Sequence, residues 1–223
     1  KQKELQISLN KLTEYIDQLK AATNTTSNEY SKIDSKKGFN LSQLSPNILQ
    51  IEDEYYSSSR PKSSYNSEDR MLKKLQEHGI DYIELRSIDL NPFKPCGIGL
   101  RNLLFLELFL IYCLQKDSSD INDYESKEIR NNDLLVSKEG RRPGLMITKS
   151  KNKISVKDWG LEILDEMEGL ISESNIKKDL FYESLSESRK MLHDPNLTPS
   201  SEVFRQVIDS NISYEEFGKN LGE

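Results

Sequence analysis

Residues 79–93 have the sequence GIDYIELRSIDLNPF, in which apolar and polar side chains alternate through the middle. Successive side chains on a β-strand point to opposite faces, so Ile83 and Leu85 share one face while Glu84 and Arg86 share the other. The apolar face is expected to pack on a core. The opposite face then presents an acid and a base, two residues apart, to whatever cavity the sheet lines.

This polar face has the chemistry that phosphoryl transfer needs. The carboxylate of Glu84 can hold Mg²⁺, which prefers hard oxygen ligands. The guanidinium of Arg86 can contact two oxygens of a phosphate group at once. A metal ion and a cation on the migrating group are what the reaction requires. Taken alone, the two residues are explained more simply as an exposed salt bridge, worth under about 1 kcal/mol.

A second informative stretch, IEDEYYSSSRPK, occupies residues 51–62. We expect a strand over 47–56, because β-branched, aromatic and acidic residues there lie between Pro46 and a run of serines. The acids and aromatics are followed by two cations, Arg60 and Lys62, and this mixture could line a pocket for a charged small molecule. An acidic sheet face followed by a basic turn is the alternative, and composition alone favours it.

The rest of the chain is predicted to be mainly helical. The pattern indicates a second strand over 80–89, a hairpin over 145–156 and a loop over 138–144. Arg141 and Arg142 in this loop could contact a phosphate, but a solvated turn is the simpler interpretation. Helices are predicted at 9–22, 67–79, 100–115, 158–173, 177–193, 200–210 and 213–221.

The order of these elements predicts an α+β fold. Residues 1–98 hold the sheet strands and two helices, the second of which Ser67 should cap and Gly79 should end. Residues 99–223 are expected to form a mainly helical region packed on the sheet, within the same structural domain. This region starts with the most apolar helix, over 100–115, which is expected to be buried in a core.

Composition argues against several classes of protein. The 223 residues include 37 acids and 31 bases, interspersed along the chain. The sequence has no basic stripe of the kind that a nucleic-acid-binding surface would show. Two cysteines and two histidines are too few for a disulfide framework or a zinc cluster. The longest apolar run, 103–114, spans about 12 residues, fewer than the roughly 20 that a membrane span needs. We expect a cytoplasmic protein that binds no nucleic acid and no membrane.

Five stretches, found in this order along the chain, resemble the bacterial glutamate–cysteine ligase family. The segment YIELRSIDLNPF is long and unusual, so chance is a poor explanation for the match. A sixth stretch, LHDPNLTPSSEVFRQVID at 192–209, is similar more loosely to the C-terminal helical region of that family. The five stretches are LTEYIDQLKAA (12–22), IEDEYYSSSRPK (51–62), GIDYIELRSIDLNPF (79–93), FLELFLIYCL (105–114) and EGRRPGL (139–145).

The resemblance implies an enzyme that joins the γ-carboxylate of L-glutamate to the amine of L-cysteine. The product is γ-glutamylcysteine, made in the first step of glutathione biosynthesis. ATP and Mg²⁺ are the implied cofactors, and ATP is hydrolysed to ADP and phosphate through an acyl phosphate. The implied fold is similar to that of glutamine synthetase, in which an antiparallel sheet forms a funnel that holds Mg²⁺. The full-length enzyme is expected to be a monomer.

The resemblance also implies roles for individual residues. Glu84 matches a metal-ligand carboxylate, and Arg86 matches the catalytic arginine that contacts the γ-phosphate. Tyr56 matches an aromatic hydroxyl of the cysteine pocket. Arg60 and Lys62 match the Arg-Pro-Lys that follows this segment in the family, for which substrate binding or nucleotide electrostatics is the expected role. The serines at 57–59 replace a proline and an aliphatic residue usual in the family, so this loop is expected to be more mobile here.

The resemblance further implies that the chain is the C-terminal part of a longer ligase. Lys1 leads directly into an amphipathic stretch, and the family's other metal carboxylates and glutamate-binding arginine are expected upstream of it. The isolated 223-residue chain should then be inactive. Two alternatives stay open. One is a related carboxylate–amine ligase with a different amine substrate, and the other is a non-catalytic helical interaction module that retains ancestral strands.

Overall fold

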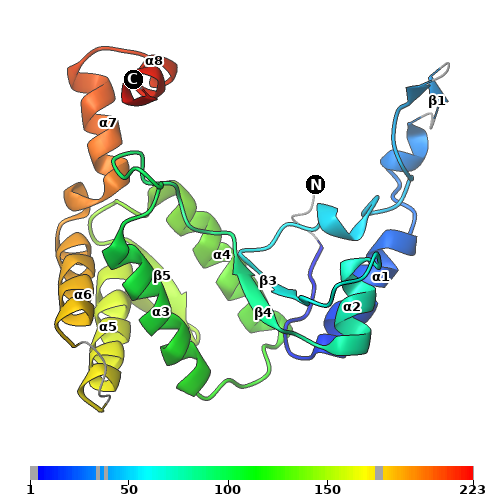
Figure 1. Ribbon diagram of the computed structural model, residues 1–223, viewed down its shortest axis with the longest axis horizontal. Helices are drawn as coiled ribbons and strands as arrows, with labels where there is room; N and C mark the ends of the chain where they lie inside the picture. Colours follow the sequence, from blue (N-terminus) through cyan, green and yellow to red (C-terminus); the bar gives the residue numbers. More distant parts are fainter. Residues whose placement is uncertain (1–4, 34–35, 38–39, 174–177, 223) are drawn as a thin grey trace. The chain divides into compact units, whose positions relative to one another are not determined.

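The computed structural model describes residues 5–33, 36–37, 40–173 and 178–222. Contacts divide the chain into two compact units, unit 1 (Lys1–Asp89) and unit 2 (Leu90–Glu223). In Figure 1, unit 1 runs from blue to blue-green and unit 2 from green to red. The predicted division at 98/99 lies between the end of unit 1 and the first helix of unit 2.

In both units the helices hold more residues than the strands, and the sheets are small, which confirms the predicted α+β class. Within the described residues the strands form three antiparallel pairs, β1–β2, β3–β4 and β5–β6. Unit 1 contains α1 (Leu12–Asn24), η2 (Tyr30–Lys32), β1 (Lys36–Lys37), β2 (Asn40–Leu41), η3 (Glu52–Glu54), β3 (Ser59–Lys62), α2 (Met71–His78) and β4 (Tyr82–Leu85). Unit 2 contains α3 (Leu100–Gln115), α4 (Asp123–Glu139), β5 (Met146–Lys149), β6 (Asn152–Ser155), α5 (Val156–Glu173), α6 (Lys178–His193), η4 (Pro195–Leu197), α7 (Pro199–Asp209) and α8 (Tyr214–Gly222).

The core of unit 1 is formed where α1 and α2 pack together. Apolar residues spaced three and four apart on α1 face those of α2, as the periodicity predicts. Gly79 ends α2 in a conformation with φ of +78°, which glycine adopts without strain. Ser67 does not cap this helix: Arg70 occupies the cap position, and the Ser67 hydroxyl accepts a hydrogen bond from the Asp69 N–H instead. The buried residues are Tyr15, Ile16, Leu19, Ala22, Leu49, Leu72 and Leu75.

The prediction of a strand over 47–56 is wrong. Asn47 makes one isolated bridge with Thr26, and Glu52–Glu54 forms the 3₁₀-helix η3. The acidic side chains of this segment bond to nearby backbone, because Glu54 accepts from the Gln50 N–H and Glu52 accepts from an N–H of α2. Such local bonds compete with a strand ladder. The strand begins later instead, within the serine run.

The strand predicted over 80–89 is present but shorter, as β4, and it pairs with β3. Its apolar face is not covered as predicted, because Ile83 remains 57% exposed. Within the described residues β3 is the one strand paired with β4, so this small sheet has two open edges.

The core of unit 2 is formed by three helices. α5 and α6 lie side by side, and α3 packs against both, as Figure 1 shows in yellow, orange and green. The helix predicted over 100–115 is therefore present, but it is not fully buried: Leu103, Leu110 and Leu114 remain exposed on the side away from α5 and α6. The buried side chains are Leu108, Leu164, Met167, Ile171, Phe181 and Leu185.

The hairpin and the later helices agree with the sequence prediction within a few residues. β5 and β6 are joined by Ser150 and Lys151, whose positive φ angles of 49° and 69° are those of a tight type I′ turn. α7 begins one residue before its predicted start, with the Thr198 hydroxyl accepting from the Ser201 N–H. In the part of the chain that the structure describes, no helix has the length and apolar character to cross a membrane.

Candidate functional site

The candidate site is built on the β3–β4 pair of unit 1. In this antiparallel ladder Arg60 lies opposite Glu84, and Lys62 lies opposite Tyr82. Two further backbone hydrogen bonds extend the pairing beyond both ends of β4, from Asp81 N–H to the Lys62 carbonyl at 2.9 Å and from Arg86 N–H to Ser58 at 2.8 Å. The ladder therefore holds Glu84 and Arg86 on a fixed backbone.

The carboxylate of Glu84 lies between two cations. Its Oε2 is 3.3 Å from the ammonium of Lys62, and its Oε1 is 3.6 Å from Nε of Arg86. Because the Glu84 side chain is 40% exposed, each of these ion pairs is worth under about 1 kcal/mol. With two cations to one carboxylate, the cluster has a net positive charge, which suits an anionic ligand.

Tyr56 also contacts Arg86. The Arg86 guanidinium lies 5.6 Å from the centre of the Tyr56 ring, within the range of a cation–π contact. The Tyr56 hydroxyl also donates a long hydrogen bond of 3.5 Å to the Arg86 carbonyl. Tyr56 is exposed, so its ring and hydroxyl stay accessible. The structure thus brings together Tyr56, Glu84 and Arg86, three of the four residues singled out from the sequence.

Arg60, the fourth residue, lies apart from this cluster. Although it is opposite Glu84 in the ladder, its side chain turns into unit 1, is 7% exposed and donates a 2.9 Å hydrogen bond to the Asp53 carbonyl. Its Nε has no hydrogen-bond partner among the described residues. Burial raises the pKa of the Tyr15 hydroxyl nearby, and the Arg60 cation partly offsets this effect. Arg60 therefore joins β3 to the helical core of unit 1.

Asp81 anchors the end of the ladder, and the sequence did not single it out. Its carboxylate accepts hydrogen bonds from the Ser64 N–H at 2.6 Å, the Ser64 hydroxyl at 2.8 Å and the Ser63 hydroxyl at 3.1 Å. The Ser64 backbone bond is the main reason that the pKa of Asp81 lies below its ordinary value. An aspartate at the start of the predicted strand over 80–89, with two serines directly after Lys62, is the sequence signal that could have indicated this anchor.

A metal ion would find one suitable ligand in this cluster. The carboxylate of Glu84 is a hard oxygen donor of the kind Mg²⁺ prefers. Across the described residues, no group of three or more His, Cys, Asp or Glu side chains is arranged to hold a metal ion. Glu84 therefore fits a Mg²⁺ site as one ligand of a larger set.

Solved structures share this fold. A crystal structure of glutamate–cysteine ligase from Francisella tularensis in complex with AMP matches 99% of this chain with a TM-score of 0.90 and 31% identity. A bifunctional glutathione synthetase from Pasteurella multocida matches 98% of the chain with a TM-score of 0.71, and its 17% identity shows a shared fold alone. The chain covers 44% and 24% of these two structures, respectively.

Sequence comparisons agree with the structural likeness. The family model described as glutamate–cysteine ligase matches residues 1–136. A protein named glutamate–cysteine ligase from Pseudomonas paraeruginosa is 37% identical over 93% of the chain, and one from Shewanella amazonensis is 34% identical over 99%. The chain belongs to the glutamate–cysteine ligase family. It spans about 40% of the length of the curated relatives that it matches.

Proposed function

We propose that this chain supplies part of the active site of an ATP-dependent glutamate–cysteine ligase. The reaction would join the γ-carboxylate of L-glutamate to the amine of L-cysteine and form γ-glutamylcysteine for glutathione synthesis. The observation that carries this proposal is the carboxylate of Glu84 between the cations of Lys62 and Arg86, on the strand whose sequence YIELR resembles the family. The AMP bound to the Francisella relative supports a nucleotide as one substrate.

The proposed chemistry has two stages. The γ-carboxylate of glutamate attacks the γ-phosphorus of ATP, and ADP leaves with the bonding electron pair. The amine of cysteine then attacks the resulting acyl phosphate, loses a proton and expels inorganic phosphate. Negative charge gathers on the phosphoryl oxygens during the first stage, and fixed cations at that position lower the barrier.

Each residue of the cluster has its own proposed role in this reaction. Arg86 would contact the migrating phosphoryl group, with Lys62 as a second cation on the same side of the sheet. Glu84 is the residue that would hold Mg²⁺, and the bound ion would neutralise phosphate charge. Tyr56 would use its hydroxyl in the cysteine pocket. The weak ion pairs to Glu84 can be exchanged for contacts with substrate at little cost.

Turnover of the intact protein with defined amines tests the proposal. ADP release should require both glutamate and an amine, and L-cysteine should give the highest kcat/KM, with L-serine and L-α-aminobutyrate as comparisons. Preference for another amine would instead support a related carboxylate–amine ligase. ADP release independent of glutamate would overturn the proposed reaction, and no ADP release in the intact protein would favour a non-catalytic module.

The 223-residue chain assayed by itself should form no γ-glutamylcysteine. Its described residues offer one carboxylate for Mg²⁺ in the candidate site, and catalysis depends on several groups held at once. Measurable product from the purified chain would contradict this expectation. We further propose that the protein acts in the cytoplasm and that it is a monomer. Sedimentation of the intact protein tests the oligomeric state.

A further inference from the structure

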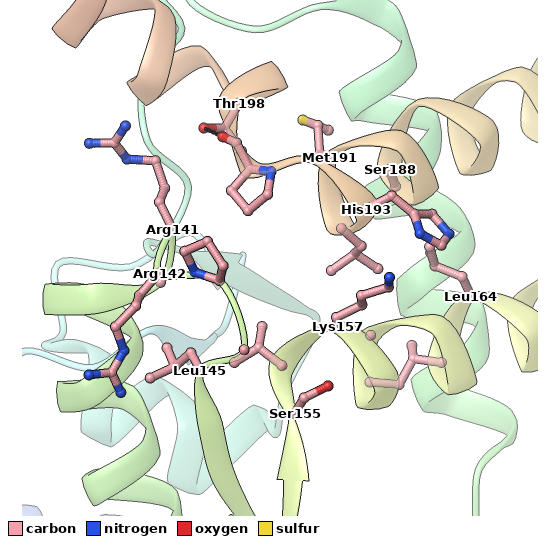
Figure 2. A pocket seen from close by; sticks show the side chains of 18 of the residues that line it. Arg141, Arg142, Leu145, Ser155, Lys157, Leu164, Ser188, Met191, His193 and Thr198 are labelled. Atoms are coloured by element: carbon pink, nitrogen blue, oxygen red, sulfur yellow. Dashed lines mark hydrogen bonds between the residues drawn. The ribbon is translucent and has the colours of Figure 1, made fainter.

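Unit 2 contains a large cavity that the proposed reaction does not use. It has a volume of about 620 Å³ and lies between the loop 140–145, the start of α5 and the end of α6 (Figure 2). Small-molecule sites commonly occupy roughly 300–1,000 Å³, so the cavity is of the right size for a ligand. None of Tyr56, Arg60, Glu84 and Arg86 lines it. Its apolar wall includes Phe105, Phe109, Leu145, Ile163, Leu164 and Leu192.

The charged side chains that line the cavity are all of one sign. About one residue in six of the chain is acidic, and the net charge is −6, yet no Asp or Glu lines the cavity. The charged or titratable residues of the lining are all bases: Arg141, Arg142, Lys157 and His193. An apolar wall without acids and with several bases favours a ligand that is itself partly apolar and negatively charged.

Two of these bases are available to a ligand. Figure 2 shows Lys157 reaching from α5 toward His193 on α6, whereas Arg141 and Arg142 extend away from the cavity. Arg141 lies over the ring of Phe204 at 5.6 Å, and Arg142 pairs with Glu139.

Lys157 differs from the two arginines, because neither an ion pair nor a cation–π contact to it is found within the described residues. Helix ends of both signs meet the cavity: the starts of α5 and α7 contribute Lys157 and Thr198, and the ends of α4 and α6 contribute Gly140 and His193. Because two positive and two negative dipole ends offset one another, the charge of the lining is set by its basic side chains.

The hydroxyl groups of the wall are already engaged. Ser155 bonds to Asp158 in a cap at the start of α5, Ser188 donates to the Ser184 carbonyl, and Thr198 donates to the Pro195 carbonyl. A sugar or a purine would therefore find few partners for its polar groups, and burying them unpaired is unfavourable. The body of the ligand has to be apolar.

We propose that this cavity binds an amphipathic anion, with an aliphatic or aromatic body against the apolar wall and one carboxylate toward Lys157 and His193. The binding site does not depend on the ligase reaction, and its test needs no turnover. The probe is decanoate, with decanol and decyltrimethylammonium as neutral and cationic counterparts of equal chain length.

Calorimetric titration of the intact protein measures this preference. Decanoate should bind saturably with one molecule per chain and more than tenfold tighter than decanol or decyltrimethylammonium. Each methylene contributes about fourfold to affinity, so octanoate should bind roughly fifteenfold more weakly than decanoate. AMP should not displace decanoate. Equal affinity for decanoate and decanol, displacement by AMP, or no saturable binding would each overturn the proposal.

A charge-reversal variant locates the anion. Lys157→Glu places an acid in the first turn of α5, where helices favour it, so the fold is retained. Decanoate affinity should fall by roughly tenfold, because an attractive contact becomes a repulsive one. Lys127→Glu is the matched control, an exposed lysine near the start of α4 that does not line the cavity, and it should change affinity less than twofold. Equal loss in both variants would show a general charge effect and refute the assigned contact.

Discussion

Replacing Arg60 by methionine removes a buried cation while keeping most of its bulk. The Arg60 Nη2 donates to the Asp53 carbonyl, whereas Nε has no hydrogen-bond partner among the described residues. Losing a hydrogen bond from a charged donor costs roughly 1.5–3 kcal/mol, and removing an unsatisfied buried donor restores roughly 1–3 kcal/mol. Asp53 is exposed, so water can replace the lost donor. We expect Arg60→Met to change the free energy of unfolding by less than about 1 kcal/mol.

Arg60→Ala is the companion variant, because it also removes the bulk of the side chain. The space left beside Tyr15, Leu19 and Leu75 should cost roughly 2–4 kcal/mol. Urea-induced unfolding of the intact protein, followed by far-ultraviolet circular dichroism, measures both variants. If Arg60→Met lowers the free energy of unfolding by about 3 kcal/mol or more, the cation makes a strong stabilising interaction. That result would refute the expectation that the lost hydrogen bond and the removed unsatisfied donor offset one another.

Kinetics then separate a structural role for Arg60 from the substrate-binding role that the family resemblance implies. If Arg60 acts through packing, Arg60→Met should keep KM for glutamate, cysteine and ATP within about twofold, because a side chain that only fills the core contacts no substrate. A tenfold rise in one KM with unchanged unfolding would assign Arg60 to that substrate.

Four further variants test the candidate site and its anchor in the intact protein. Arg86→Ala should lower kcat by roughly 10²–10³ because it removes a cation acting on developing charge, and near-normal turnover would remove Arg86 from the mechanism. Glu84→Gln should raise the Mg²⁺ concentration needed for half-maximal rate, and an unchanged requirement would place Glu84 outside the metal site. Tyr56→Phe should raise KM for cysteine but not for ATP, and equal effects on both would indicate a structural tyrosine. The pKa of Asp81 is lowered in the fold, so its stabilisation is present at neutral pH and is lost as pH falls below about 4 toward the folded pKa. Asp81→Asn should therefore lower the melting temperature more at pH 7 than at pH 3, whereas Asp17→Asn on the exposed side of α1 should change it at neither pH.

The sequence predicted most of the helices, since their signals are local, but it predicted no helix over the charged segment that forms α4. The apolar spacing of α1 and the glycine after α2 each determine structure within a few residues. The strand over 47–56 failed for the opposite reason, because its composition suits a strand while Glu52 and Glu54 satisfy nearby backbone groups instead. Whether α3 is buried on all sides depends on distant partners, so periodicity could not show that Leu110 and Leu114 stay exposed.

For the site, the alternation of side chains along one strand could be predicted from the sequence, whereas the register between the two strands could not. The two-residue spacing correctly places Glu84 and Arg86 together, 3.6 Å apart. No pattern in the sequence shows that β3 pairs with β4 so that Lys62 reaches Glu84 while Arg60 turns inward. These choices depend on the twist of the ladder and on the space beside α1 and α2. The sequence therefore indicated which residues are chemically able to act, and the fold decides which of them meet.

The β3–β4 site combines a fixed backbone with exchangeable side chains. Asp81 holds one end of the ladder through three hydrogen bonds, and the Arg86 N–H closes the other end on Ser58. Between these points Glu84 forms ion pairs with Lys62 and Arg86 that are long and partly exposed, so a phosphate or a metal ion can replace them at a cost of about 1 kcal/mol or less each. Functional groups act best when their supports are rigid and their own contacts are easily exchanged. A substitution at Asp81 should therefore disturb catalysis through the position of Arg86, whereas one at Arg86 removes the cation and leaves the ladder intact.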